Sequence, residues 1–192
     1  MKSALILHGT NATTNDNWFP WLKEKLEAKG YQIWLPQLPG ADKPNIARYN
    51  QFLLANKDFK FNEDTTIIGH SSGAVAALGL LQALPVGTKV GNCYLVSAFT
   101  HDLGWESLVD LFDPPLDYAK IKNKAKKLIF IHGDEDPYCP LAETKALAAD
   151  LEGEMKVVPG AKHFSISTDG PNYQKFPFLL ELLEKKKQQE VI

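Results

Sequence analysis

The chain has 192 residues, of which 44% are hydrophobic and 23% charged, and its 21 Lys and Arg against 23 Asp and Glu leave a net charge of −2. This composition is typical of a soluble globular protein, and the length favours a single domain over residues 1–192. The balanced charge argues against nucleic acid as a partner, because nucleic-acid-binding proteins usually present a basic face. The longest apolar run, residues 74–81, is far shorter than the roughly 20 residues of a membrane-spanning helix, which argues against a membrane protein.

Short apolar runs alternate with helical patterns along the chain. We expect strands over residues 4–7, 32–35, 65–68, 93–96, 128–131 and 156–158, and helices over residues 18–29, 46–57, 72–84, 141–151 and 173–187. Gly30 and Gly153 are placed to end the first and the fourth of these helices. Most of the runs are apolar throughout, as in strands covered on both faces. The order predicts an α/β fold: a three-layer α/β/α doubly wound sandwich with about six parallel strands.

A Gly-x-Ser-x-Gly sequence, Gly69-His70-Ser71-Ser72-Gly73, lies between a predicted strand and a predicted helix. In that context the glycines allow a sharp turn that exposes the serine hydroxyl at the carboxyl edge of the sheet. We therefore expect Ser71 to be a nucleophile. The backbone N–H of Ser72 would then face a developing oxyanion at the helix N-terminus. The alternative is a tight turn that carries no chemistry.

A serine nucleophile needs a base, and the chain has five histidines. His163 follows the last predicted strand and satisfies the order Ser…Asp…His, so we expect it to be the base. His8 and His132 precede glycines at strand ends and are expected to be buried turn residues. His70 should point away from the Ser71 hydroxyl, and His101 should lie on the surface.

The acid that orients His163 is expected in the turn after residues 128–131, where Asp134, Glu135 and Asp136 lie close together. Asp136 precedes a proline that stiffens the loop, which favours it over the other two, expected to be exposed. The alternative is an acidic loop without a role. A second oxyanion donor should come from the loop after the first strand, where the N–H of Thr10 follows Gly9.

The sequence resembles the small serine hydrolases of the α/β-hydrolase superfamily, the family that includes the YdeN-like and retinoblastoma-binding serine hydrolases. The resemblance runs nearly end to end, over residues 8–10, 17–22, 69–73, 117–121, 132–140 and 160–164. It implies Ser71 as nucleophile, Asp136 as acid and His163 as base, in a compact sheet without a large cap domain. In the acid loop, residues 132–140, Cys139 stands where the family usually has valine. The Leu-x-Cys-x-Glu motif linked to retinoblastoma protein is absent, so no protein partner is inferred.

These residues predict a serine hydrolase that cleaves a small ester-like acyl substrate through an acyl-enzyme, without metal or organic cofactor. Two alternatives remain: an interaction protein with this fold and little turnover, and an acyltransferase or peptidase with the same triad. The two cysteines, Cys93 and Cys139, are too few for a disulfide framework and fit a reducing compartment, so we expect a cytoplasmic protein.

Residues 98–126 are longer than a simple crossover requires and too short for a separate cap domain. Their apolar positions predict a short helix held down by hydrophobic contacts. In one interpretation these side chains all pack against the sheet. In the other, Phe99 and Trp105, together with Phe164, line a shallow, open pocket for a short acyl group. The Asn17-Trp18 pair is expected to cap and pack the first helix rather than to contact substrate.

Overall fold

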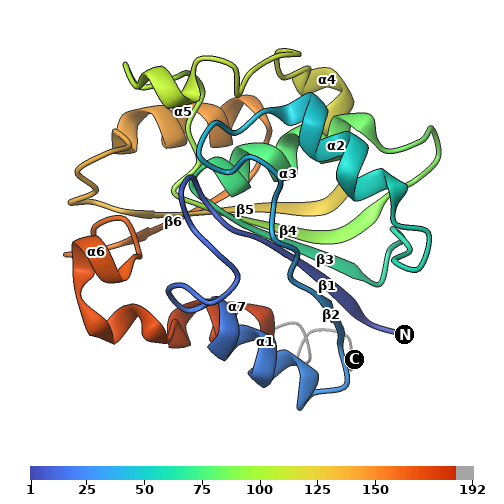
Figure 1. Ribbon diagram of the computed structural model, residues 1–192, viewed down its shortest axis with the longest axis horizontal. Helices are drawn as coiled ribbons and strands as arrows, with labels where there is room; N and C mark the ends of the chain where they lie inside the picture. Colours follow the sequence, from blue (N-terminus) through green and yellow to red (C-terminus); the bar gives the residue numbers. More distant parts are fainter. Residues whose placement is uncertain (185–192) are drawn as a thin grey trace.

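A six-stranded parallel sheet forms the centre of the structure, a computed structural model that describes residues 1–184 (Figure 1). The strands are β1 (Ser3–Leu7), β2 (Gln32–Trp34), β3 (Thr65–His70), β4 (Val90–Val96), β5 (Ala125–Gly133) and β6 (Glu154–Val158), in the spatial order β2-β1-β3-β4-β5-β6. Every neighbouring pair is parallel. The predicted fold class is confirmed, because each expected apolar run overlaps one strand, although β2 ends one residue before the expected run 32–35, and all six strands share one sheet.

Helices cover both faces of this sheet (Figure 1). The helices α1 (Phe19–Glu27) and α7 (Pro177–Glu184) lie on one face, and α2 (Ile46–Ala55), α3 (Ser72–Ala83), α4 (Tyr118–Ile121) and α5 (Leu141–Asp150) lie on the other. Successive strand residues alternate between the two layers: Leu5 and Leu7 pack with the α2–α3 side, whereas Ala4 and Ile6 pack with α1 and α7. Both faces are therefore apolar, which explains the continuous hydrophobic runs.

The last helix begins later than the sequence pattern predicts. Instead of one helix from residue 173, the chain forms the 3₁₀ helix η2 (Pro171–Gln174), becomes extended at Lys175 and then begins α7 at Pro177. Proline disfavours a helical conformation in the residue before it and suits the first turn of a helix, which places the boundary there. The predicted residues 185–187 lie outside the described part of the chain. A short helix, α6 (Ile166–Asp169), precedes η2 and was not predicted.

The helical parts of segment 98–126 are the 3₁₀ helix η1 (Glu106–Leu108) and the four-residue α4, so the expected short helix is reduced to one turn. Leu103 and Gly104 both have positive φ angles, which prevent a regular helix from starting before them. Leu108 and Leu111 are buried, whereas Trp105 is 49% and Val109 60% exposed. The segment is thus held by a few apolar side chains and leaves others at the surface. Within residues 1–184, no helix has the length and apolar character needed to cross a bilayer.

Three histidines are buried where strands end, as expected for two of them. His8 accepts a hydrogen bond from the Leu38 N–H at Nε2, at 2.9 Å, and its Nδ1 lies 3.0 Å from the Gly9 carbonyl oxygen. The Nε2 of His132 lies 3.0 Å from the carbonyl oxygen of Cys139. Burial lowers the pKa of both rings from the ordinary 6.5. Burial, and then the neighbouring His163, lower the pKa of His70 to about 3.

These shifts predict that the protein loses stability in acid. The unfolded chain binds protons at histidines below pH 6.5, whereas the folded chain keeps His70 neutral down to about pH 3. The contribution of His70 to the free energy of unfolding is therefore complete above pH 6.5 and declines as the pH falls. Around pH 5 we expect His70 to contribute about 1.4 kcal/mol per pH unit to the slope of stability against pH.

Urea unfolding at several pH values between 4.5 and 7 measures that slope. His70→Gln should reduce it by about this amount, whatever its effect on absolute stability. His101→Gln is the matched control, because the His101 side chain is 56% exposed. Equal slopes in the wild type and His70→Gln would contradict the assignment of a neutral, buried His70.

Candidate active site

A cleft of about 590 Å³ lies at the carboxyl edge of the sheet, where ligands bind in doubly wound folds. Its walls come from the loops that follow several strands, far apart in the sequence. Thr10 follows β1, Ser71 follows β3, Phe99 follows β4, Tyr138 follows β5 and His163 follows β6. The parallel topology therefore brings to one place the sequence motifs that were singled out separately.

Ser71 lies at the sharp turn between β3 and α3 and has a φ of 57°, which is uncommon for a residue other than glycine. The turn brings strand and helix too close for larger side chains. A Cβ on Gly69 would lie 2.6 Å from Ala74 Cα, and one on Gly73 would lie 2.5 Å from the His8 carbonyl oxygen. The N–H of Ser71 donates to the Val96 carbonyl oxygen at 2.8 Å. Its half-buried side chain lines the cleft.

Two backbone amides beside Ser71 are suited to an oxyanion. Within residues 1–184, the N–H of Thr10 makes no hydrogen bond. Ser72 is the first residue of α3, so its N–H has no acceptor within the helix and lies at the positive end of the helix dipole. The Thr10 hydroxyl donates to Ser72 Oγ at 2.8 Å, which ties the loop after β1 to the start of α3.

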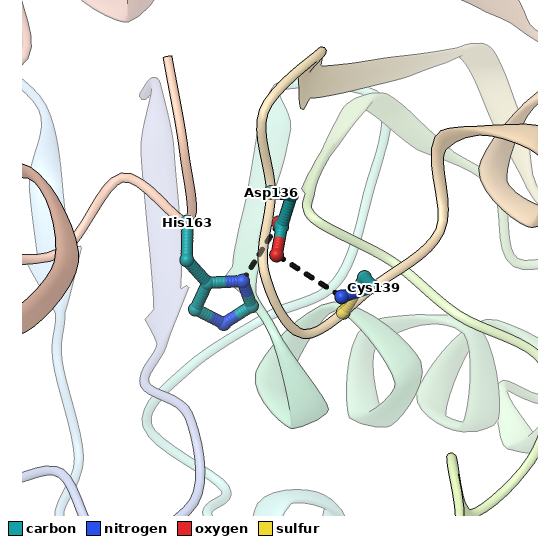
Figure 2. Close-up of side chains that lie close together, drawn as sticks. All are labelled: Asp136, Cys139 and His163. Atoms are coloured by element: carbon teal, nitrogen blue, oxygen red, sulfur yellow. Dashed lines mark hydrogen bonds and ion pairs between the residues drawn. The ribbon is translucent and has the colours of Figure 1, made fainter.

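Asp136 and His163 form a buried, hydrogen-bonded pair (Figure 2). The Nδ1 of His163 lies 2.8 Å from Asp136 Oδ2, and the two side chains are 8% and 0% exposed. The same carboxylate oxygen accepts from the Ser97 hydroxyl at 3.0 Å. Its other oxygen accepts from the backbone N–H groups of Tyr138 and Cys139, at 2.9 and 3.0 Å. Asp134 and Glu135, by contrast, are exposed.

These contacts determine that Asp136 is ionised and which ring nitrogen of His163 carries a proton. Burial alone would raise the pKa of Asp136, but the hydrogen bond and charge of His163 and the two backbone N–H groups outweigh it, so the pKa lies below its usual value. An ionised carboxylate can only accept, which means that Nδ1 of His163 carries the proton. The Nε2 of a neutral His163 is then left as a proton acceptor.

Ser71 and His163 both line the cleft, although no hydrogen bond joins Ser71 Oγ to the imidazole in the described part of the chain. In unliganded active sites, such contacts are often long and tighten when substrate binds. The cleft therefore holds a serine hydroxyl, a carboxylate-paired imidazole and two available amides. That set can attack a carbonyl carbon and stabilise the oxyanion that results.

Two predictions about the surroundings need correction. Phe164 does not line the cleft: it is fully buried, with a φ of 52°, and stacks on Phe176 at 4.9 Å between ring centres. Asn17 lines the cleft and does not cap α1; its Oδ1 instead accepts from the Ile166 N–H at 2.9 Å. Phe99 and Trp105 do line the cleft. His101 lies on the surface as expected and pairs with Glu143.

Sequence reasoning missed two residues of the site. Ser97 supports Asp136 from the end of β4, and the exposed ring of Tyr138 lies 5.0 Å from the ring of His163. Tyr138 lies within the acid loop, two residues after Asp136, so an aromatic residue at that spacing was a usable signal. Nothing local marks Ser97, because its contact with Asp136 spans 39 positions.

Asp136, Cys139 and His163 are close enough to be considered as metal ligands, with their donor atoms within 4.8 Å of one another (Figure 2). Two of these groups already hydrogen-bond to each other. Burial raises the pKa of the Cys139 thiol, whereas a metal would need the thiolate. The chemistry of this donor set fits a hydrogen-bonded pair beside an apolar thiol better than a metal centre.

Comparison with known proteins agrees with this geometry. A family model for serine hydrolases matches residues 4–185. YdeN of Bacillus subtilis (strain 168) is 28% identical over 183 residues, covering 95% of this chain and 94% of YdeN. Serine hydrolase RBBP9 of Rattus norvegicus is 30% identical over 161 residues, covering 82% of this chain and 83% of RBBP9. The crystal structure of the B. subtilis ydeN gene product has a TM-score of 0.87 at 27% identity, covering 96% of this chain and 98% of that one. The chain therefore belongs to the serine hydrolase family.

Proposed function

We propose that this serine hydrolase cleaves small carboxylic esters through Ser71, Asp136 and His163. The observation that carries the proposal is the buried Asp136–His163 pair beside the cleft that Ser71 also lines. His163 acts as the base, Asp136 holds it in the required tautomer and Ser71 attacks the carbonyl carbon. The backbone N–H groups of Thr10 and Ser72 stabilise the oxyanion, each donor lowering the barrier by roughly 3–4 kcal/mol.

The reaction proceeds in two acyl transfers. The Ser71 proton passes to His163 Nε2 as Oγ bonds to the carbonyl carbon; the ester C–O bond then breaks and the proton passes to the leaving alkoxide. Water next gives a proton to His163 as its oxygen bonds to the acyl carbon. The bond between that carbon and Ser71 Oγ then breaks, the acid leaves, and His163 returns the proton to Ser71. Asp136 stays ionised throughout and stabilises the imidazolium formed in each half. This route uses water and no cofactor.

The proposed substrate is a small molecule with a short acyl group. Phe99, Trp105 and Leu108 of segment 98–126 line the cleft, but the segment leaves Trp105 half exposed rather than closing over the site. We propose that the protein works in a reducing compartment, the cytoplasm. The free, buried thiols of Cys93 and Cys139 support this location.

The nucleophile assignment predicts that Ser71→Ala abolishes labelling by a fluorophosphonate probe, because the probe bonds to the activated hydroxyl. Ser72→Ala should still be labelled, at a rate lowered several-fold at most. Ser72 contributes its backbone N–H, which alanine retains, and only one hydroxyl contact, with Thr10. Mass spectrometry of the labelled peptide identifies the modified residue. Label on any residue but Ser71 would exclude the proposed mechanism.

The acid assignment predicts that Asp136→Asn lowers kcat for a short ester by about 10³- to 10⁴-fold, because an amide no longer enforces the His163 tautomer. Asp134→Asn is the matched control from the same loop. Asp134 is exposed, and its Oδ1 accepts from the Gly160 N–H at 2.7 Å, a bond that asparagine can retain. Steady-state kinetics with both variants test the choice; a larger loss in the Asp134 variant would move the acid to that residue.

The open cleft predicts a preference for acyl chains of two to about six carbons, since each methylene left in water forgoes roughly 0.8 kcal/mol of binding. Trp105→Ala should alter this chain-length profile with little change in melting temperature, because the side chain is half exposed. Val109→Ala is the control, because Val109 is an exposed residue of the same segment that is absent from the cleft wall. Kinetics with a series of p-nitrophenyl esters measure the profile, and a marked preference for long chains would contradict the prediction.

A further inference from the structure

The loop that carries His163 is held by side chains from two distant parts of the chain. The carbonyl oxygen of His163 lies 2.7 Å from His70 Nε2. The next carbonyl oxygen, that of Phe164, accepts from Trp18 Nε1 at 3.1 Å. Asn17 adds a third bond by accepting from the Ile166 N–H at 2.9 Å. Three of four consecutive residues are thus fixed through their backbone groups.

The His70 contact defines the proton position on that ring. A carbonyl oxygen only accepts, so Nε2 of His70 carries the proton and donates it to His163. The other ring nitrogen, Nδ1, is buried and has no hydrogen-bond partner in the described part of the chain. A buried acceptor without a partner lowers stability, so Nδ1 gives no reason for a histidine at this position. The hydrogen bond from Nε2 to the His163 carbonyl oxygen does give one.

His70 is also the residue that immediately precedes Ser71. Its ring centre lies 5.0 Å from that of His163 and 5.9 Å from that of Trp18, which is itself fully buried. One side chain therefore joins the backbone beside the serine hydroxyl to the backbone of the imidazole residue. Trp18 supports the next peptide group from the start of α1.

We propose that His70 and Trp18 are positioning residues that hold the main chain of His163 so that its imidazole Nε2 meets the Ser71 hydroxyl. The hydrogen bond to Asp136 orients the imidazole ring of His163. It does not by itself fix the position of the His163 main chain. Phe164 has a φ of 52°, so the backbone after His163 is held in a conformation that phenylalanine rarely adopts. This inference rests on the proposed function, because it assigns a role through the proposed base.

The chemistry requires that this support be uncharged. When His163 takes up the serine proton it becomes a cation, and a second cation beside it would oppose that step. Burial keeps His70 neutral at working pH, since its pKa is lowered to about 3. A neutral histidine with its proton on Nε2 donates to the loop without repelling the imidazolium.

The test uses three variants of the full chain. Trp18→Phe removes the indole N–H and keeps an aromatic ring, His70→Leu removes the donor, and His70→Gln restores an N–H donor. Trp21→Phe is the matched control, because Trp21 lies in the first turn of the helix that Trp18 precedes, is partly buried and makes no hydrogen bond through its indole within residues 1–184. Each kcat is expressed per site titrated by a fluorophosphonate, so that misfolded protein does not count.

We expect His70→Leu to lower kcat per titrated site by about 10- to 100-fold, because displacing a reacting group by about 1 Å costs that much, while KM changes little. His70→Gln should recover part of the loss, and Trp18→Phe should fall below Trp21→Phe. The low-field proton NMR signal of His163 Nδ1–H should shift or broaden in Trp18→Phe and His70→Leu but not in Trp21→Phe.

A purely structural role gives a different result. Fewer titrated sites, each with the wild-type kcat and an unchanged low-field signal, would overturn the proposal. If His70→Leu does not fold, the comparison of Trp18→Phe with Trp21→Phe decides by the same measure.

Ser71→Ala distinguishes failure of the proposed function from failure of the positioning role. Persistent labelling of that variant would refute the proposed function, whereas lost labelling with fully active Trp18→Phe and His70→Leu sites would refute only the positioning role.

Discussion

The close approach of α3 to β3 and to the end of β1, around Ser71, is the constraint on which the site depends. A residue with a side chain at Gly69 or Gly73 would collide with neighbouring backbone, so the two glycines permit the turn and Ser71 takes up its unusual φ of 57°. The surrounding parallel sheet makes that strained turn tolerable, because the Ser71 N–H still finds an acceptor on β4. The same contact between layers places the helix N-terminus and its free amide directly after the serine.

Burying the charge of Asp136 is the second demand on the fold. A carboxylate whose side chain is fully buried would normally be protonated, yet four donors, two from backbone and two from side chains, stabilise its charged form. Three of these donors come from the acid loop itself and from the end of β4. Removing His163 would thus still leave three hydrogen-bond donors on the carboxylate.

The sequence was informative where function depends on local backbone chemistry. Glycines around Ser71, the proline after Asp136 and the order of the strand ends predicted three residues that the structure brings to one edge of the sheet. It was uninformative where side-chain direction depends on an unexpected backbone angle. Phe164 was expected in the cleft, but its positive φ turns the ring into the core. The contact of Ser97 with Asp136 and that of Trp18 with Phe164 join distant residues, and no local pattern encodes them.

The five histidines illustrate how burial divides roles among identical side chains. His8, His70 and His132 are kept neutral by desolvation, and each is engaged with backbone groups that shape the loops at the sheet edge. His101 lies at the surface beside Glu143. His163 differs from all four because it lies in the cleft wall and its Nδ1 is paired with the buried carboxylate of Asp136. Under the proposed function, these surroundings suit one imidazole to proton transfer in the cleft, and the proposed part of the neutral His70 ring is to hold the backbone rather than to carry charge.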